Sequence, residues 1–314
     1  MSISMSVPSR LDRRSFASLA ASATGAAWLW SPFGAGADDG PKPLLTVALP
    51  SDTHLGRSKE KDVELMRQAV GEINASNAAC TIFCGDLVNA GELPENERRY
   101  PEWLELAKQL KRDHFAVPGN HDPDALFLNH LRKETDYSIS LGDHRFVCFR
   151  NAEVNPGHMG VVTPKQVEWL DGEMRQAAKQ NQRVILIAHV IHHDNKHPDV
   201  GWYIKEGREA FRKLLETHRH VVALFGGHFH CGLRGWTDTA AVSRDGEASR
   251  GVVEVVLPSV SYNRDRGLKD APGFKLDEYR SGFTLVELFA DKLTLKYKPL
   301  GVDLVASCDV ALRT

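Results

Sequence analysis

Residues 44–54 read LLTVALPSDTH, an apolar run that ends at a proline and is followed by Asp52 and His54. A short apolar run bounded by turn residues predicts a strand that is buried on both faces. Residues 62–73 come next, and their apolar side chains recur at helical spacing. The pattern is therefore a strand followed by a helix, and two side chains that can bind metal stand where the strand ends.

The alternation of strand and helix patterns continues through most of the chain. Further strands are predicted at 81–84, 115–117, 183–188 and 221–225, and further helices at 103–110, 164–178 and 206–217. The last part is rich in strand patterns, at 251–257 and at 282–297, with a hairpin near Asp291. Buried strands that alternate with helices predict an α/β sheet covered on both faces, and the strand-rich end predicts a second sheet packed against it. The expected fold is an αββα sandwich of two mixed β-sheets flanked by helices.

Polar side chains that can bind metal ions follow five of these strand patterns. They are Asp52 and His54, Asp86 after Gly85, Asn120 after Gly119, His189, and the pair His228 and His230. Ligands of α/β sheets bind outside the carboxyl ends of the strands, so these residues are expected to meet in one crevice. Carboxylates, imidazoles and amide oxygens are donors that zinc, manganese and iron accept. Each segment alone could be a polar turn or a hydrogen-bonded core histidine, but the five together predict a metal site.

The order Asp-x-His, Gly-Asp, Gly-Asn-His-Asp, His, Gly-His-x-His resembles that of the calcineurin-like metallophosphoesterase superfamily. The motifs that carry the resemblance run from Asp52 to His230. The resemblance implies two metal ions, whose identity (iron, manganese or zinc) stays open. It implies that one ion is held by Asp52, His54, Asp86 and His230, and the other by Asp86, Asn120, His189 and His228. The Asp86 carboxylate would bridge the two ions.

The activity that the resemblance implies is hydrolysis of a phosphate ester, most simply a phosphodiester, by a hydroxide that bridges the two metal ions. His121 would either protonate the departing alkoxide or hold it by a hydrogen bond. Asp122 could orient His121, but we expect it to cap the helix that follows. The alternatives are a phosphomonoesterase or nucleotidase, and a metal-binding scaffold that does not turn over substrate.

The second motif separates branches of the superfamily. This chain has Asn89-Ala90-Gly91 where protein Ser/Thr phosphatases have Asp-Arg-Gly, so the arginine that would grip the phosphate is missing. The purple acid phosphatase branch lacks the histidine that His54 supplies. The chain is therefore most similar to the bacterial branch of small phosphodiesterases, a resemblance that does not fix the substrate.

The stretch between the fourth and fifth motifs is polar and is expected to form a loop near the mouth of the site. Lys196, His197 and Trp202 could contact substrate from this loop, although a solvated loop without such a role explains the pattern equally well. Pro258-Ser259 and Tyr262-Asn263, after a late strand, could also line the pocket.

The first 37 residues resemble a twin-arginine export signal. Arg13, Arg14 and Phe16 match that pattern, and a short apolar run and Ala35-Gly36-Ala37 follow. Asp12 and Ala17-Ser18 depart from it, and a disordered tail or an uncleaved anchor are the alternatives. The expected organisation is a signal at residues 1–37 and one catalytic domain at 38–314. The expected location is the periplasm or the extracellular space.

Composition limits the partners that the protein can have. The formal net charge is −2, which gives no basic patch for nucleic acid or an anionic membrane. The five cysteines are odd in number and contain no CxxC pair, so they predict neither structural zinc nor a disulfide framework. We therefore expect a small phosphoester as the substrate and no membrane span in the mature chain. The pattern does not indicate an oligomeric state.

Overall fold

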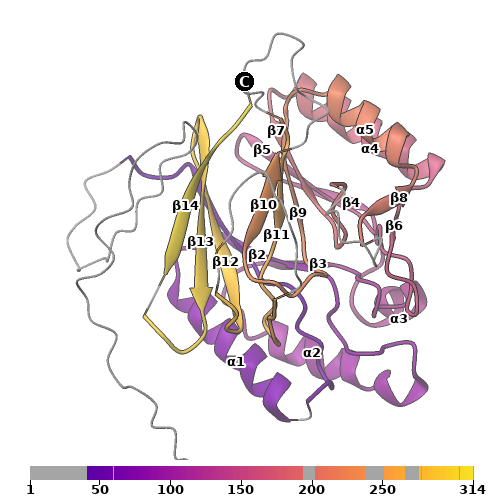
Figure 1. Ribbon diagram of the computed structural model, residues 1–314, viewed down its shortest axis with the longest axis vertical. Helices are drawn as coiled ribbons and strands as arrows, with labels where there is room; N and C mark the ends of the chain where they lie inside the picture. The colour runs from indigo at the N-terminus through magenta and orange to yellow at the C-terminus, as the bar shows by residue number, and fades with distance from the viewer. Residues whose placement is uncertain are drawn as a thin grey trace, which may run out of the picture. The chain divides into compact units, whose positions relative to one another are not determined.

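The computed structural model describes residues 41–58, 60–193, 202–237, 251–265, 276, 278–303 and 305–313. The predicted export signal, Lys196 and His197 lie outside the described residues. Two six-stranded sheets and five α-helices make up most of this part (Figure 1). Among the described residues, no helix is both long and apolar enough to cross a bilayer.

The first sheet has the strand order β14-β13-β12-β1-β2-β3. Its three parallel strands are β1 (Leu45–Leu49), β2 (Cys80–Cys84) and β3 (His114–Val117). The antiparallel strands β12 (Gly282–Leu288), β13 (Lys292–Pro299) and β14 (Ala306–Ala311) extend it on the β1 side. The helices α1 (Glu60–Ala75) and α2 (Arg99–Ala107) pack against this sheet and bury residues such as Met66 and Trp103. The 3-10 turn η1 (Pro94–Asn96) precedes α2.

The second sheet has the order β10-β11-β9-β7-β5-β4. Its members are β4 (Tyr137–Leu141), β5 (His144–Cys148), β7 (Arg183–Ile187), β9 (Val221–Gly226), β10 (Arg234–Thr237) and β11 (Val253–Val256). The helices α4 (Pro164–Lys179) and α5 (Arg208–Thr217) cover its outer face. Helix α3 (Asp124–His130) follows the third predicted motif, and β6 (Gly160–Val161) pairs with β8 (Ile204–Glu206) in a small separate sheet.

The apolar core between the two sheets contains side chains from both of them, including Leu49 and Ile82 from one and Ile185 and Val255 from the other. The order of layers is therefore helices, sheet, sheet, helices, which confirms the predicted αββα sandwich of mixed sheets. The five cysteines are buried and free, as expected of small apolar side chains.

One detail of the predicted fold is wrong. The strand-rich end does not form a second sheet of its own, because β12 pairs with β1 whereas β11 pairs with β9. The first sheet therefore joins strands from the beginning and the end of the chain, whereas the late strand β11 joins the second sheet, whose other strands come from the middle. Helix α2 also begins four residues before the predicted start and ends at Ala107.

Candidate metal centre

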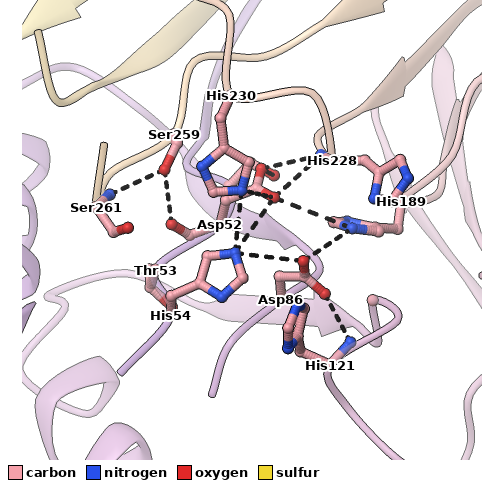
Figure 2. A network of polar contacts seen from close by, with 12 residues as sticks. Asp52, Thr53, His54, Asp86, His121, His189, His228, His230, Ser259 and Ser261 are labelled. Carbon is pink, nitrogen blue, oxygen red and sulfur yellow. Dashed lines mark hydrogen bonds and ion pairs between the residues drawn. The ribbon is translucent and has the colours of Figure 1, made fainter. Parts of the chain in front are cut away.

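The predicted ligands stand at the carboxyl ends of β1, β2, β3, β7 and β9, so they come from both sheets (Figure 2). Five of them have backbone φ angles in the left-handed region: 53° for Asp52, 42° for His54, 51° for Asp86, 73° for His228 and 50° for His230. Such angles cost energy for residues other than glycine and occur most often where function requires them. The turns after these strands are thus bent in a way that aims the polar side chains at a common point.

Two glycines make room for the close approach of these turns. A Cβ on Gly119 would overlap the Asp86 carboxylate, and a Cβ on Gly227 would overlap the Asp52 carboxylate. The glycine that precedes the ligand in each of these motifs is therefore needed for packing between loops.

The first group of side chains contains Asp52, His54, Asp86 and His230, all of them buried. The Nε2 atoms of His54 and His230 lie 3.0 Å apart. His230 Nε2 also lies 3.1 Å from Asp52 Oδ1, and His54 Nε2 lies 3.3 Å from Asp86 Oδ2. Four donor atoms that converge in this way could bind one cation.

The second group contains Asp86, His189 and His228. His189 Nε2 lies 3.3 Å from Asp86 Oδ2, the same oxygen that faces His54, so this oxygen is shared by both groups. The other carboxylate oxygen of Asp86 accepts a hydrogen bond from the His121 amide at 2.9 Å. Asn120 is buried in the turn after β3, and its Oδ1 atom has no hydrogen-bond partner in the described part of the chain.

Backbone carbonyls orient three of the four imidazoles. His189 Nδ1 donates to Cys84 O at 2.8 Å, and His230 Nδ1 donates to Tyr262 O at 2.9 Å. His228 donates from Nε2 to His158 O at 2.9 Å, which leaves its Nδ1 atom for a ligand. Histidines that bind metal usually donate their second nitrogen to such an acceptor. These three carbonyls are the acceptors that the sequence could not identify.

Charge and burial favour the protonation states that metal ligands need at most of these positions. Burial alone would raise the pKa of Asp52, but the charge and hydrogen bond of His230 and the charge of His189 together outweigh burial and lower the pKa to about 2. Burial lowers the pKa of His54 to about 3 and that of His228 well below its usual value. Burial would lower the pKa of His189, but the Asp86 and Asp52 carboxylates and the Cys84 carbonyl together outweigh burial and raise the pKa to about 9. The carboxylates are thus ionised, two imidazoles are neutral, and a cation would take the place of the proton on His189.

The donor set fits a pair of metal ions. Asn120 Oδ1 and His189 Nε2 are buried polar atoms without a hydrogen-bond partner in the described residues, and His189 Nε2 faces the Asp86 carboxylate. Buried polar atoms normally have partners, so unpaired ones that converge with carboxylates are typical of a cation site. The structure thus brings together six of the seven side chains that the sequence predicts as ligands, and the seventh, Asn120, is buried in the turn after β3.

His121 and Asp122 have separate contacts. The His121 ring lies edge-on to His54 with 4.8 Å between centroids, and its Nδ1 atom accepts a hydrogen bond from the Ala90 amide at 3.0 Å. Asp122 neither orients His121 nor caps α3, whose N-cap residue is Pro123. Its carboxylate instead accepts the amides of Leu87, Val88 and Gly119. The expected helix cap is therefore wrong, because Asp122 joins the loops after β2 and β3.

Asn151 is a site residue that the sequence reasoning missed. It is fully buried, its Oδ1 atom accepts the amides of His189 and Val190, and its Nδ2 atom donates to Val190 O. Asn151 therefore fixes the turn that presents His189. The signal was a polar residue two positions after the apolar run 146–149, a run for which no strand was predicted.

Of the three predicted substrate contacts, only Trp202 falls in the described part of the chain. Its ring centroid lies 4.9 Å from that of His228 and 5.6 Å from that of His158. Tyr262 lies near the two histidines of the first group, with its ring centroid 4.3 Å from that of His230 and 6.4 Å from that of His54. Ser259 donates from its hydroxyl to Asp52 O at 2.9 Å, so it supports a ligand turn.

Comparisons with known proteins agree with this geometry. The sequence profile of the calcineurin-like phosphoesterase family matches residues 45–232. A 3′,5′-cyclic adenosine monophosphate phosphodiesterase from Haemophilus influenzae is 24% identical over 205 residues, which cover 60% of this chain and 71% of that protein. A glycerophosphodiester phosphodiesterase from Enterobacter lignolyticus is 24% identical over 213 residues, which cover 59% of this chain and 71% of that protein.

A comparison with solved structures finds a similar fold. The crystal structure of a dimetal phosphatase from Danio rerio has a TM-score of 0.60 and 15% identity, and the match covers 85% of this chain and all of that chain (100%). The chain therefore belongs to the calcineurin-like phosphoesterase family and is a metal-dependent hydrolase of phosphoester bonds.

Proposed function

We propose that this protein hydrolyses small phosphodiesters at a pair of metal ions. The observation that carries the proposal is the Asp86 oxygen that faces His54 in one group of ligands and His189 in the other, at 3.3 Å from each. A carboxylate shared between two cations is the arrangement that a two-metal hydrolase needs. The names of the two relatives, both of them phosphodiesterases, support a diester over a monoester.

The ligand assignment follows from the two groups. Asp52, His54, Asp86 and His230 would hold one ion, and Asp86, Asn120, His189 and His228 the other. Iron, manganese and zinc all accept this mixture of imidazole and oxygen donors. When bound, the ions would supply Lewis acidity toward the phosphoryl group and lower the pKa of water so that a nucleophile forms near neutral pH.

We propose that His121 donates a hydrogen bond to the leaving group. Because the Ala90 amide donates to Nδ1, that nitrogen carries a lone pair and the ring proton resides on Nε2. An imidazolium would turn a second N–H against the Ala90 amide. Of the two roles expected for His121, this contact supports a neutral donor that holds the developing alkoxide rather than an acid that transfers a proton.

Substrate turnover and metal content test this function together. We expect the purified full-length chain to bind about two metal ions per molecule and to hydrolyse bis(4-nitrophenyl) phosphate faster than 4-nitrophenyl phosphate. A strong preference for the monoester would replace the proposal with a phosphomonoesterase or nucleotidase. Bound metal without turnover of either ester would sink the proposal of a phosphodiesterase.

We also propose that the enzyme acts outside the cytoplasm. Arg13 and Arg14 before a short apolar run support an export signal of the twin-arginine type, with the mature chain starting near Asp38. Fractionation of a bacterial host that has this export route should find the enzyme in the periplasm. The double variant Arg13→Lys, Arg14→Lys should stay in the cytoplasm, and equal export of both forms would contradict the proposal.

A further inference from the structure

Two exposed arginines flank one aromatic ring at the edge of the metal centre. The Arg57 guanidinium carbon lies 3.5 Å from the centroid of the Tyr262 ring, and that of Arg264 lies 6.0 Å from the same centroid. The Tyr262 ring in turn lies 4.3 Å from the ring of His230. The sequence alone predicts no role for either of these two arginines.

The Arg57 side chain and His230 must lie on opposite faces of Tyr262. Both are within van der Waals range of the ring, and a guanidinium at 3.5 Å and an imidazole at 4.3 Å would overlap on one face. The tyrosine ring therefore separates Arg57 from the metal ligand. An arginine behind this ring is not placed to contact a phosphoryl group bound at His230, so it does not replace the missing arginine of the Asp-Arg-Gly motif.

The turns that carry this group are tied to the metal centre. Tyr262 accepts from His230 through its carbonyl, and its amide donates to Ser259 Oγ at 3.1 Å. The Arg264 amide donates to His230 O at 2.7 Å, and the Arg57 amide donates to His54 O at 3.1 Å. The backbone of each arginine is thus hydrogen-bonded to a ligand residue. These bonds fix the position from which each arginine side chain extends.

The charge of these arginines is left for a ligand. Neither guanidinium forms an ion pair in the described part of the chain. Asp62 interacts electrostatically with Arg57, but its carboxylate is buried and accepts the amides of Ser58 and Arg57 at the start of α1. Stacking on Tyr262 holds the planar guanidinium in place while its N–H groups stay available at the ring's edge.

We propose that Arg57, with Arg264 beside it, forms an anion subsite that selects phosphodiesters with a second anionic group. Such a group would be a carboxylate or phosphate on the alcohol that stays bonded to phosphorus. The leaving alcohol is assigned to His121, whose ring contacts His54, whereas the arginines lie behind the ring that covers His230. This inference rests on the proposed phosphodiesterase function and names the substrate class of that same site.

A matched pair of substrates tests the subsite. The 4-nitrophenyl diester of 2-carboxyethyl phosphate and its uncharged carboxamide analogue share a leaving group and differ in one charge. We expect the metal-loaded enzyme to prefer the carboxylate by about five- to tenfold in kcat/KM, mainly through KM, at low salt. Arg57→Gln should abolish this preference by lowering kcat/KM of the carboxylate diester to that of the carboxamide. Arg264→Gln should reduce the preference less, and added salt should weaken it in the wild type.

Arg67→Gln is the matched control, because Arg67 is an exposed arginine on α1 that pairs with Glu64 away from Tyr262. It should leave both substrates unaffected. Equal use of the two diesters by the wild type would overturn the subsite and leave the phosphodiesterase function standing, as would an equal loss for both substrates in Arg57→Gln. If the metal-loaded wild type hydrolyses neither diester, the phosphodiesterase function fails, and the subsite fails with it.

Discussion

The floor and the rim of the metal centre are built in opposite ways. The floor consists of the buried side chains Asp52, His54, Asp86, Asn120, His189, His228 and His230, and nearly every one has an internal partner that holds it. The rim consists of Arg57, His158, Trp202, Tyr262 and Arg264, which are exposed or half-buried and meet each other mainly through ring contacts. The floor is therefore suited to hold ions in a fixed geometry, whereas the rim is suited to choose among substrates. Substitutions should separate these two tasks.

The largest effect is expected from Asp86→Asn in the floor. The amide keeps the shape of the side chain but removes the anionic oxygen that faces both histidines, so both ions lose a ligand. We expect metal content to collapse and kcat/KM to fall by about a thousandfold or more. Elemental analysis and diester turnover measure both quantities, with the exposed Asp143→Asn as control. Retention of two full equivalents of metal would refute the bridging role of Asp86.

Asp122→Ala should mainly lower the stability of the fold, with a smaller effect on catalysis. Its carboxylate satisfies three buried backbone amides, and their loss leaves these donors unpaired. We expect the free energy of unfolding of the metal-free protein to fall by about 3 kcal/mol. Urea denaturation followed by fluorescence measures it. Asp124→Ala, two residues further on and half-exposed, should change it much less, and an equal effect of the two substitutions would show that Asp122 does not join the loops.

His121 lies at the boundary between floor and rim, because its ring contacts the ligand His54 but is not itself a predicted ligand. The substitution that tests its role is His121→Ala. We expect metal content to be retained and kcat to fall by about a hundredfold, as for the loss of one donor to a developing oxyanion. The loss should be larger for alcohols that are poor leaving groups. His114→Ala, at the amino end of β3, is the control. If metal is lost and the dependence on the leaving group is unchanged, His121 is a structural residue of the floor.

Trp202→Ala should give the smallest effect and the one most confined to the rim. The ring borders His228 without being a ligand, so its removal should change KM about fivefold for bulky diesters and leave kcat and metal content near the wild-type values. Steady-state kinetics with a small and a bulky diester measures the difference. Trp169→Ala on α4, away from the centre, controls for the loss of an indole. Loss of metal in Trp202→Ala would place this residue in the floor.

The floor could be predicted from sequence more completely than the rim, of which only Trp202 and Tyr262 were candidates, and the reason is physical. The predicted ligands are Asp, His and Asn residues that follow strand ends, so apolar runs closed by Asp52 or His189 reveal them one by one. The contacts of Asp122 and Asn151 escaped because a carboxylate or amide that accepts backbone amides leaves no spacing pattern. Arg57 and Tyr262 are 205 positions apart along the chain, and only the fold brings them together.

The same limit explains the errors in the fold. Strands such as β1 and β7 were found because they are continuously apolar, but no local pattern tells which sheet a late strand will join. The strand β12 pairs with β1 across most of the chain's length, and β11 pairs with β9. The short strands β4, β5 and β10 were missed because polar residues interrupt their apolar pattern.

The ligands follow strands of both sheets, and this has a consequence for how the protein unfolds. Asp52, Asp86 and Asn120 follow strands of one sheet, whereas His189 and His228 follow strands of the other. Each bound ion would therefore be a coordinate cross-link between two layers whose shared core is mainly apolar. Chelation should then lower the melting temperature and loosen the sheets first at their carboxyl ends, while raising the free metal concentration should stabilise the whole domain logarithmically.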